Sequence, residues 1–123
     1  VVHGADGIDE ISTTGYTKVS ECRDGAVNTF YLHPADLGLQ KAPPEALKGG
    51  DASENARIIE RVLAGDAGAP RDIVVLNAGA ALFIAGAAGS IREGMARAAE
   101  AITSGGAART LATLVRLSSG ADA

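Results

Sequence analysis

The chain has 123 residues and a formal net charge of −4 at pH 7, with 46% apolar residues but only 3% aromatic ones. The length fits one domain, and its core has to be built from Ala, Val, Ile and Leu. The acidic balance argues against a nucleic-acid surface. The single cysteine, Cys22, excludes an internal disulfide and a thiolate metal site. Residue 1 lies within an apolar run and is not Met, so we expect a piece of a longer protein.

Residues 73–89 carry no charged side chain, and this length is the minimum for a membrane span, about 17 residues. The run is rich in Ala and contains Asn77, Gly79 and Gly86, which favours a helix buried all round in a globular domain. The N-terminus has no signal-peptide pattern. We therefore expect a cytoplasmic protein that makes no contact with a membrane.

Residues 1–3 are typical of the end of a strand and are followed by a loop over residues 4–15. Residues 18–22 and 26–32 predict a β-hairpin, because Asp24-Gly25 between them suits a tight turn with positive φ. Three of the hairpin side chains are expected to cover one face: Val19, Val27 and Tyr31. Cys22 is interpreted as a small apolar strand residue.

Helices are expected after the hairpin, over residues 51–64, 72–88, 91–104 and 107–118, with a short helical turn at 43–47. Asp51 with Glu54, and Ser90 with Glu93, are capping pairs for the first and third helices. The residues expected to face inward are Ile58, Ile59, Val62, Leu63, Met95, Ala98, Ala99, Ile102, Leu111, Leu114 and Val115. The elements together predict an α/β fold whose first strand needs neighbouring strands.

The most informative segment for chemistry is the loop after the first strand, which contains Asp6, Asp9 and Glu10. Magnesium is typically held by one or two carboxylates, with water and phosphate oxygens completing its coordination. Adjacent acids can converge in an irregular loop, so Asp9 and Glu10 are candidate metal ligands, and Asp6 could assist. The alternative is a solvated acidic loop in which an Asp caps the next turn.

Other candidates have structural alternatives that we favour. His3 could transfer a proton, but a hydrogen-bonded structural role is the stronger interpretation. Gly49-Gly50-Asp51 resembles an anion-binding helix start, although Asp51 and Glu54 would repel an anion there. Asn77 is expected to satisfy a backbone group or a helix contact. The remaining set comprises solvated arginines on helix faces: Arg57, Arg61, Arg109 and Arg116.

Four runs of residues occur in a characteristic order. They are VVHG followed by DGIDE at residues 6–10, PADLGL at 34–39, GGDASENA at 49–56, and RDIVVLNAGAAL at 71–82. Together they resemble the motifs VHG-x-DG-[IL]-DE, P-x-D-[FL]-G-L, GGDA-x-ENA and RD-x-V-x-LNA-x-AAL of the anthranilate phosphoribosyltransferase family. The resemblance covers essentially all of residues 1–123.

The resemblance implies the C-terminal part of the family's large α/β domain, a nucleoside phosphorylase/phosphoribosyltransferase-type fold, without the N-terminal helical domain. It implies transfer of a phosphoribosyl group from phosphoribosyl pyrophosphate to anthranilate in tryptophan biosynthesis. By the same resemblance, Asp9 and Glu10 bind Mg²⁺, and the full-length protein forms a homodimer.

The family's pyrophosphate-cradling glycine loop and anthranilate-binding arginine would lie upstream of Val1. We therefore assign no catalytic or substrate-binding residue, and we expect residues 1–123 alone to be inactive. One alternative is a nucleic-acid-binding paralogue of the same fold without biosynthetic activity, which would need a basic surface. A nucleoside phosphorylase of related fold is disfavoured because the GGDASENA and LNAGAAL runs match the first family better.

Overall fold

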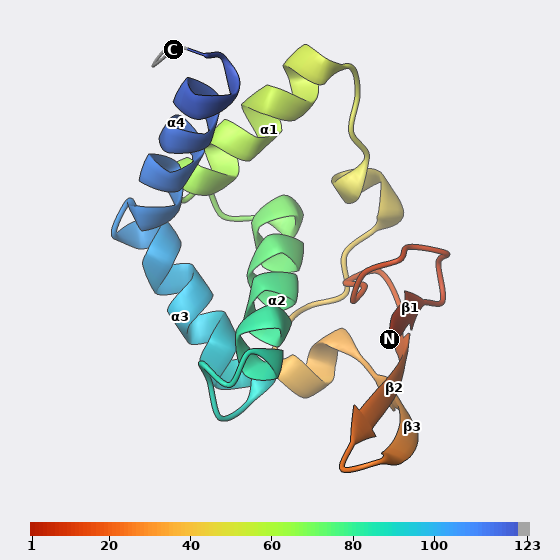
Figure 1. Ribbon diagram of the computed structural model, residues 1–123. Coiled ribbons are helices and arrows are strands. Elements are labelled where there is room, and N and C mark those ends of the chain that lie inside the picture. Colours follow the sequence, from red (N-terminus) through yellow and green to blue (C-terminus); the bar gives the residue numbers. More distant parts are fainter. Residues whose placement is uncertain (121–123) are drawn as a thin grey trace.

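The computed structural model describes residues 1–120. Its antiparallel sheet has the order β1-β2-β3 and consists of β1 (Val2–Gly4), β2 (Thr17–Arg23) and β3 (Ala26–Leu32). The predicted hairpin is confirmed, since Asp24 and Gly25 form its turn with φ values of 51° and 78°. The sheet stands at one side of the helices (Figure 1). The first strand therefore finds its neighbour in β2.

The prediction that Val19, Val27 and Tyr31 cover one face of the hairpin is wrong. Val19 pairs with Phe30, whereas Val27 pairs with Cys22, and paired residues share a face of the sheet. Val19 and Cys22 are separated by an odd number of positions and so point to opposite faces. Val27 and Tyr31 consequently lie on the face opposite Val19, where they are 66% and 59% exposed. Cys22 is also exposed there as a free thiol.

Two short 3₁₀ helices, η1 (Pro34–Leu37) and η2 (Pro44–Leu47), lead into the main helices: α1 (Ala52–Ala64), α2 (Ala69–Ile84), α3 (Ile91–Thr103) and α4 (Gly106–Ser118). Both predicted N-caps are confirmed. The Asp51 carboxylate accepts a 2.8 Å bond from the Glu54 N–H, and Ser90 Oγ accepts a 3.1 Å bond from the Glu93 N–H.

The second helix begins and ends earlier than predicted. It starts at Ala69 because Pro70 lies in the first turn, where a missing N–H loses no helical bond. It ends at Ile84, and Gly86 follows with a φ of 73°. The shift leaves residues 85–88 outside the helix, although Ala88 is still buried.

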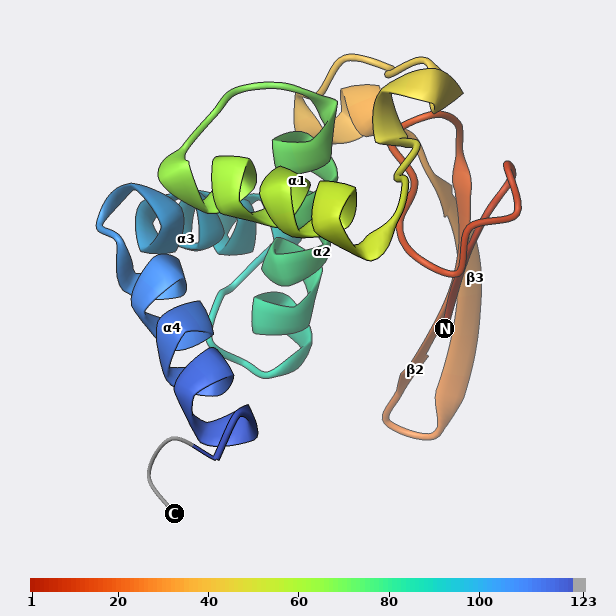
Figure 2. The ribbon, with the colours of Figure 1, turned by 90° about the horizontal axis from the view of Figure 1, so that it is seen from above.

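The core is formed mainly where α2 packs against α3, with α1 beside them (Figure 2). Leu76 is fully buried at its centre. The loop between β1 and β2 contributes one side chain, Ile11, to this core. The other members come from α1, α2 and α3: Val62, Val75, Ala80, Met95, Ala98 and Ile102. The core therefore joins the helices directly to the acidic loop.

Several predicted inward faces are only partly confirmed. Met95, Ala98 and Ile102 are buried as expected, but Leu114 and Val115 of α4 are 61% and 56% exposed. On α1 only Val62 is buried, and Ile59 is exposed. The expectation that α2 is buried all round is also wrong, since Ile84 at its end is 83% exposed.

Within residues 1–120 no single helix is long and apolar enough to cross a membrane. Together, α1 and α2 have the length and apolar composition of a membrane span, but the two helices are bent by 71° relative to each other.

Candidate metal-binding site

The acidic pair lies in the loop that joins β1 to β2. Asp9 and Glu10 are both exposed. In the part of the chain that the structure describes, neither carboxylate makes a hydrogen bond or an ion pair. No third His, Cys, Asp or Glu of residues 1–120 joins them in a metal-binding group. Two free carboxylates match the small protein contribution that Mg²⁺ usually takes.

Asp6 does not form a group with Asp9 and Glu10 in the described residues, and its carboxylate is already hydrogen-bonded within the loop. Its Oδ1 accepts a 3.2 Å bond from the Ile8 N–H. Its Oδ2 accepts bonds from the hydroxyl of Ser12 at 2.7 Å and from the hydroxyl of Thr14. Partial burial alone would raise the pKa of Asp6, but these donors together hold that pKa below its usual value. Asp6 is therefore an anionic anchor for the loop.

A buried group of hydroxyl side chains continues this anchor toward the sheet. Ser12 and Thr17 are almost completely buried, and the Ser12 N–H donates to Thr17 Oγ1 at 2.9 Å. The Thr14 N–H donates to Ser12 Oγ at 3.0 Å. This network was not predicted, although the Ser-Thr-Thr run after the acids is a signal for it, since such side chains bond nearby backbone groups.

The start of the loop folds back on itself at Gly4. The Gly4 N–H donates to the Ile8 carbonyl at 2.8 Å, and the Gly7 N–H donates to the Gly4 carbonyl at 2.9 Å. A Cβ atom on Gly4 would lie 2.6 Å from Cγ2 of Ile8 and 3.0 Å from Cβ of Ser12. Only glycine fits this turn, which fixes Ile8 immediately before the acidic pair.

Asn77 of α2 fixes the other side of the pair. Its Oδ1 accepts a 2.9 Å bond from the Ile11 N–H, and its Nδ2 donates a 2.9 Å bond to the Ile11 carbonyl. The same Nδ2 also donates to the Ile73 carbonyl, at 3.0 Å, one turn earlier in α2. The prediction that Asn77 satisfies a backbone group is confirmed, but its partner in the acidic loop was not foreseen.

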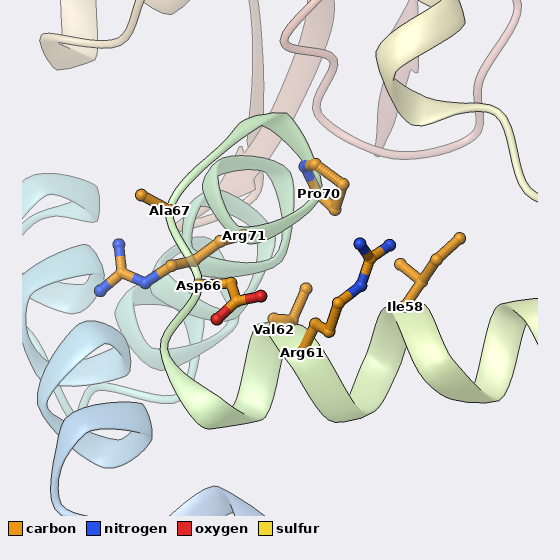
Figure 3. A pocket seen from close by; sticks show the side chains of 7 residues that line it. All are labelled: Ile58, Arg61, Val62, Asp66, Ala67, Pro70 and Arg71. Atoms are coloured by element: carbon orange, nitrogen blue, oxygen red, sulfur yellow. The ribbon is translucent and has the colours of Figure 1, made fainter.

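Two hollows lie near α1 and α2. One is an apolar groove of about 540 Å³ that Glu10 and Asn77 line together with side chains of both helices. The other, of about 260 Å³, lies between the end of α1 and the start of α2 and contains Arg61, Asp66 and Arg71. Figure 3 shows that the two guanidinium groups point in different directions. This second hollow therefore does not gather positive charge around a single position.

The remaining predicted positions are placed as follows. His3 is exposed on β1 opposite Lys18, and within residues 1–120 its imidazole makes no hydrogen bond. The prediction of a hydrogen-bonded structural histidine is therefore wrong. Asp51 caps α1, as noted above, so the helix start after Gly49-Gly50 carries a protein carboxylate in place of an anion site.

Comparison with known proteins supports the resemblance of the motifs. The family profile described as "Glycosyl transferase family, a/b domain" matches residues 1–108. The anthranilate phosphoribosyltransferase of Parvibaculum lavamentivorans is 51% identical over 120 residues, which are 98% of this chain and 35% of that protein. The enzyme of the same name from Methylorubrum extorquens is 55% identical over 117 residues, which are 95% of this chain and 35% of that protein.

Solved structures of similar proteins agree with the fold. Anthranilate phosphoribosyltransferase from Thermus thermophilus superposes with a TM-score of 0.75 at 42% identity, covering 85% of this chain and 31% of that one. The Saccharomyces cerevisiae enzyme, in complex with PRPP and Mg, gives a TM-score of 0.78 at 32% identity, covering 89% of this chain and 32% of that one.

The chain spans about a third of the length of the relatives that it matches. The family profile nevertheless covers most of the chain, and the α/β architecture agrees with the solved relatives. This chain belongs to the glycosyl transferase family and carries part of its α/β domain.

Proposed function

We propose that this chain forms the C-terminal part of the α/β domain of an anthranilate phosphoribosyltransferase. That enzyme transfers the phosphoribosyl group of phosphoribosyl pyrophosphate to anthranilate in tryptophan biosynthesis. The observation that carries the proposal is the free acidic pair, Asp9 and Glu10, on a loop fixed at both ends. It is supported by about half-identical relatives of that name and by a related structure with PRPP and Mg.

Asp9 and Glu10 would hold Mg²⁺ at the surface of the loop. The ion, when bound, neutralises the negative charge that develops on the departing pyrophosphate. The exposure of both carboxylates leaves room for phosphate and water oxygens in the remaining coordination positions. Asp6, already bonded by two hydroxyls, keeps its charge for the loop and does not compete for the ion.

The exposed apolar surface of the chain supports a larger assembly. The accessible area is 7771 Å², roughly a quarter more than the ~6,100 Å² typical of a monomer of 12.3 kDa. An apolar groove of about 610 Å³ separates β1 and β2 from α2. Large apolar side chains are exposed on several elements: Val27, Phe30, Tyr31, Ile84, Leu114, Val115 and Leu117. We propose that further parts of the enzyme, including a second subunit of a homodimer, cover these faces.

The proposal also assigns the enzyme to the cytoplasm, because the exposed thiol of Cys22 is stable in a reducing compartment. The residues that hold the sugar and anthranilate belong, in this proposal, to the other two thirds of the enzyme. Residues 1–123 alone are therefore proposed to be inactive.

The proposal is tested by assaying the intact protein with phosphoribosyl pyrophosphate, anthranilate and Mg²⁺. We expect anthranilate fluorescence to fall while pyrophosphate is released in equal amount, and we expect neither change with residues 1–123 alone. A reaction without anthranilate is the control for simple donor hydrolysis. Turnover by residues 1–123 alone, or no transfer by the intact protein, would contradict the proposal.

A further inference from the structure

We infer that Asn77 is a positioning residue for the acidic pair: its side-chain amide fixes the backbone of the metal-binding loop to α2. The inference rests on the proposed function, because the metal that the loop would hold belongs to that function. Asn77 makes no hydrogen bond to Asp9 or Glu10; it acts through Ile11. A residue of this kind determines the position of the two carboxylates without ligating the ion.

The geometry around Asn77 leaves its amide a single orientation. Oδ1 and Nδ2 bond both backbone polar groups of Ile11 at 2.9 Å. The second hydrogen of Nδ2 bonds the Ile73 carbonyl at 3.0 Å, inside the same helix. A flipped amide would bring Nδ2 against the Ile11 N–H and Oδ1 against two carbonyls. The helix therefore presents one acceptor and one donor to Ile11 in a fixed register.

Ile11 is a firm attachment point because its side chain belongs to the core. It is 4% exposed and packs in the cluster that contains Leu76. On the other side of the pair, Ile8 is held by the Gly4 N–H at 2.8 Å and by the Asp6 carboxylate at 3.2 Å. Asp9 and Glu10 are the two residues between these fixed points, and they have no partners of their own in the described chain. The positions of Asp9 and Glu10 thus depend on the bonds that hold Ile8 and Ile11.

Without the bonds that hold Ile11, the acidic pair could sample many backbone conformations. A metal that binds such a loop has to order it, and the entropic cost of this ordering weakens metal binding. Residues that orient metal ligands from outside the coordination sphere typically change metal affinity by about 10- to 100-fold when they are removed. For Asn77, which acts through the backbone, we expect the lower end, about tenfold.

The chain contains a matched control for this contact. Asn55 of α1 bonds the backbone of Gly50 in the same two-point manner, with the Gly50 N–H on Oδ1 at 2.9 Å and Nδ2 on the Gly50 carbonyl at 3.0 Å. The Asn55 amide fixes the residues that lead into α1 and makes no bond to the loop that carries the acidic pair. A general effect of losing an Asn clamp would appear in both variants, whereas a positioning effect would appear only at Asn77.

The test compares Asn77→Ala, Asn77→Asp and Asn55→Ala in the intact protein. Mn²⁺ binding is measured by electron paramagnetic resonance in the presence of phosphoribosyl pyrophosphate and without anthranilate, so that no turnover occurs. Hydrogen exchange of the Ile11 amide and the thermal midpoint are measured on the same samples. Asn77→Asp keeps an oxygen for the Ile11 N–H but loses the donor to the Ile11 carbonyl, so an intermediate effect is expected.

We expect Asn77→Ala to weaken Mn²⁺ binding about tenfold and to speed exchange at Ile11, with Asn55→Ala within twofold of the wild type in both. Wild-type Mn²⁺ affinity in a folded Asn77→Ala protein would overturn the inference. If that variant does not fold, Asn77→Asp decides by the same criterion. Weakened Mn²⁺ binding in Asp9→Asn/Glu10→Gln together with unchanged binding in the Asn77 variants would overturn this inference alone. No effect of the acidic double variant would instead contradict the proposed function.

Discussion

Gly94 of α3 lies directly against Gly79 of α2 at the point where the two helices cross. A Cβ atom on Gly94 would lie 2.8 Å from the carbonyl carbon of Gly79, and one on Gly79 would lie 2.9 Å from Cα of Met95. Backbone atoms cannot move aside as a flexible side chain can, so each position accepts only hydrogen. This close approach brings α2 and α3 together around Leu76, and α2 in turn carries the amide that holds the acidic loop.

Gly94→Ala is expected to destabilise the intact protein by roughly 1–3 kcal/mol, the usual range for overpacking a well-packed core. The sign of this change in unfolding free energy is informative, because helix propensity alone would make Ala more stable than Gly, by up to about 1 kcal/mol. Urea unfolding measures the change. Gly15→Ala is the control, since a Cβ there would meet Ala5 at an ordinary 3.9 Å. An unfolding midpoint for Gly94→Ala at or above that of the wild type would contradict the close crossing.

Gly4→Ala is expected to disturb the acidic loop itself. The added methyl would overlap Oδ1 of Asp6 and lie 2.6 Å from Cγ2 of Ile8, so the loop has to open to admit it. We expect a loss of about 1–2 kcal/mol in unfolding free energy and weaker Mn²⁺ binding, because Ile8 no longer fixes one end of the pair. Mn²⁺ affinity equal to that of the wild type would show that the turn at Gly4 does not position the carboxylates.

Asp6 is expected to make stability depend on pH in acid. Its pKa is lowered in the folded protein relative to an unfolded value of about 3.9. Its contribution is therefore fully present above about pH 5 and is lost as the pH falls through the folded pKa. Asp6→Asn should lower the unfolding free energy at pH 7, and the difference from the wild type should shrink toward pH 3.

The control for Asp6 is Asp24→Asn in the hairpin turn. Asn-Gly suits that turn as well as Asp-Gly does, so the variant removes an acid without disturbing the fold. Urea unfolding at pH 7 and pH 3 is the measurement. A gap between Asp6→Asn and the wild type that stays constant or widens toward pH 3 would contradict the assignment of Asp6 as the anchor.

Much of the fold was predictable because its signals are local. The Asp24-Gly25 turn, the Asp51 and Ser90 caps and the helix limits of α1 and α3 each follow from neighbouring residues, and the structure confirms them. The acidic pair was also visible in the sequence, since a loop with Asp9 and Glu10 after a strand is a local pattern.

The predictions that failed depend on what covers a face or on contacts between distant residues. Periodicity places Leu114 and Val115 on one side of α4, but it does not say that another element packs there, and none of the described elements buries them. The bond between Asn77 and Ile11 joins residues 66 positions apart, so no sequence window contains both. The side of the sheet that Val19 faces is likewise set by its pairing with Phe30.

Asp9 and Glu10 are proposed to hold the magnesium ion used in the reaction of the intact protein. The test of this role is the Mg²⁺ dependence of pyrophosphate release in the intact protein carrying Asp9→Asn/Glu10→Gln. The control is Asp24→Asn/Glu45→Gln, which makes the same change in charge at two other exposed acids. We expect the Mg²⁺ concentration for half-maximal activity to rise at least about tenfold in the first variant only. An unchanged Mg²⁺ dependence, or an equal shift in both variants, would contradict it.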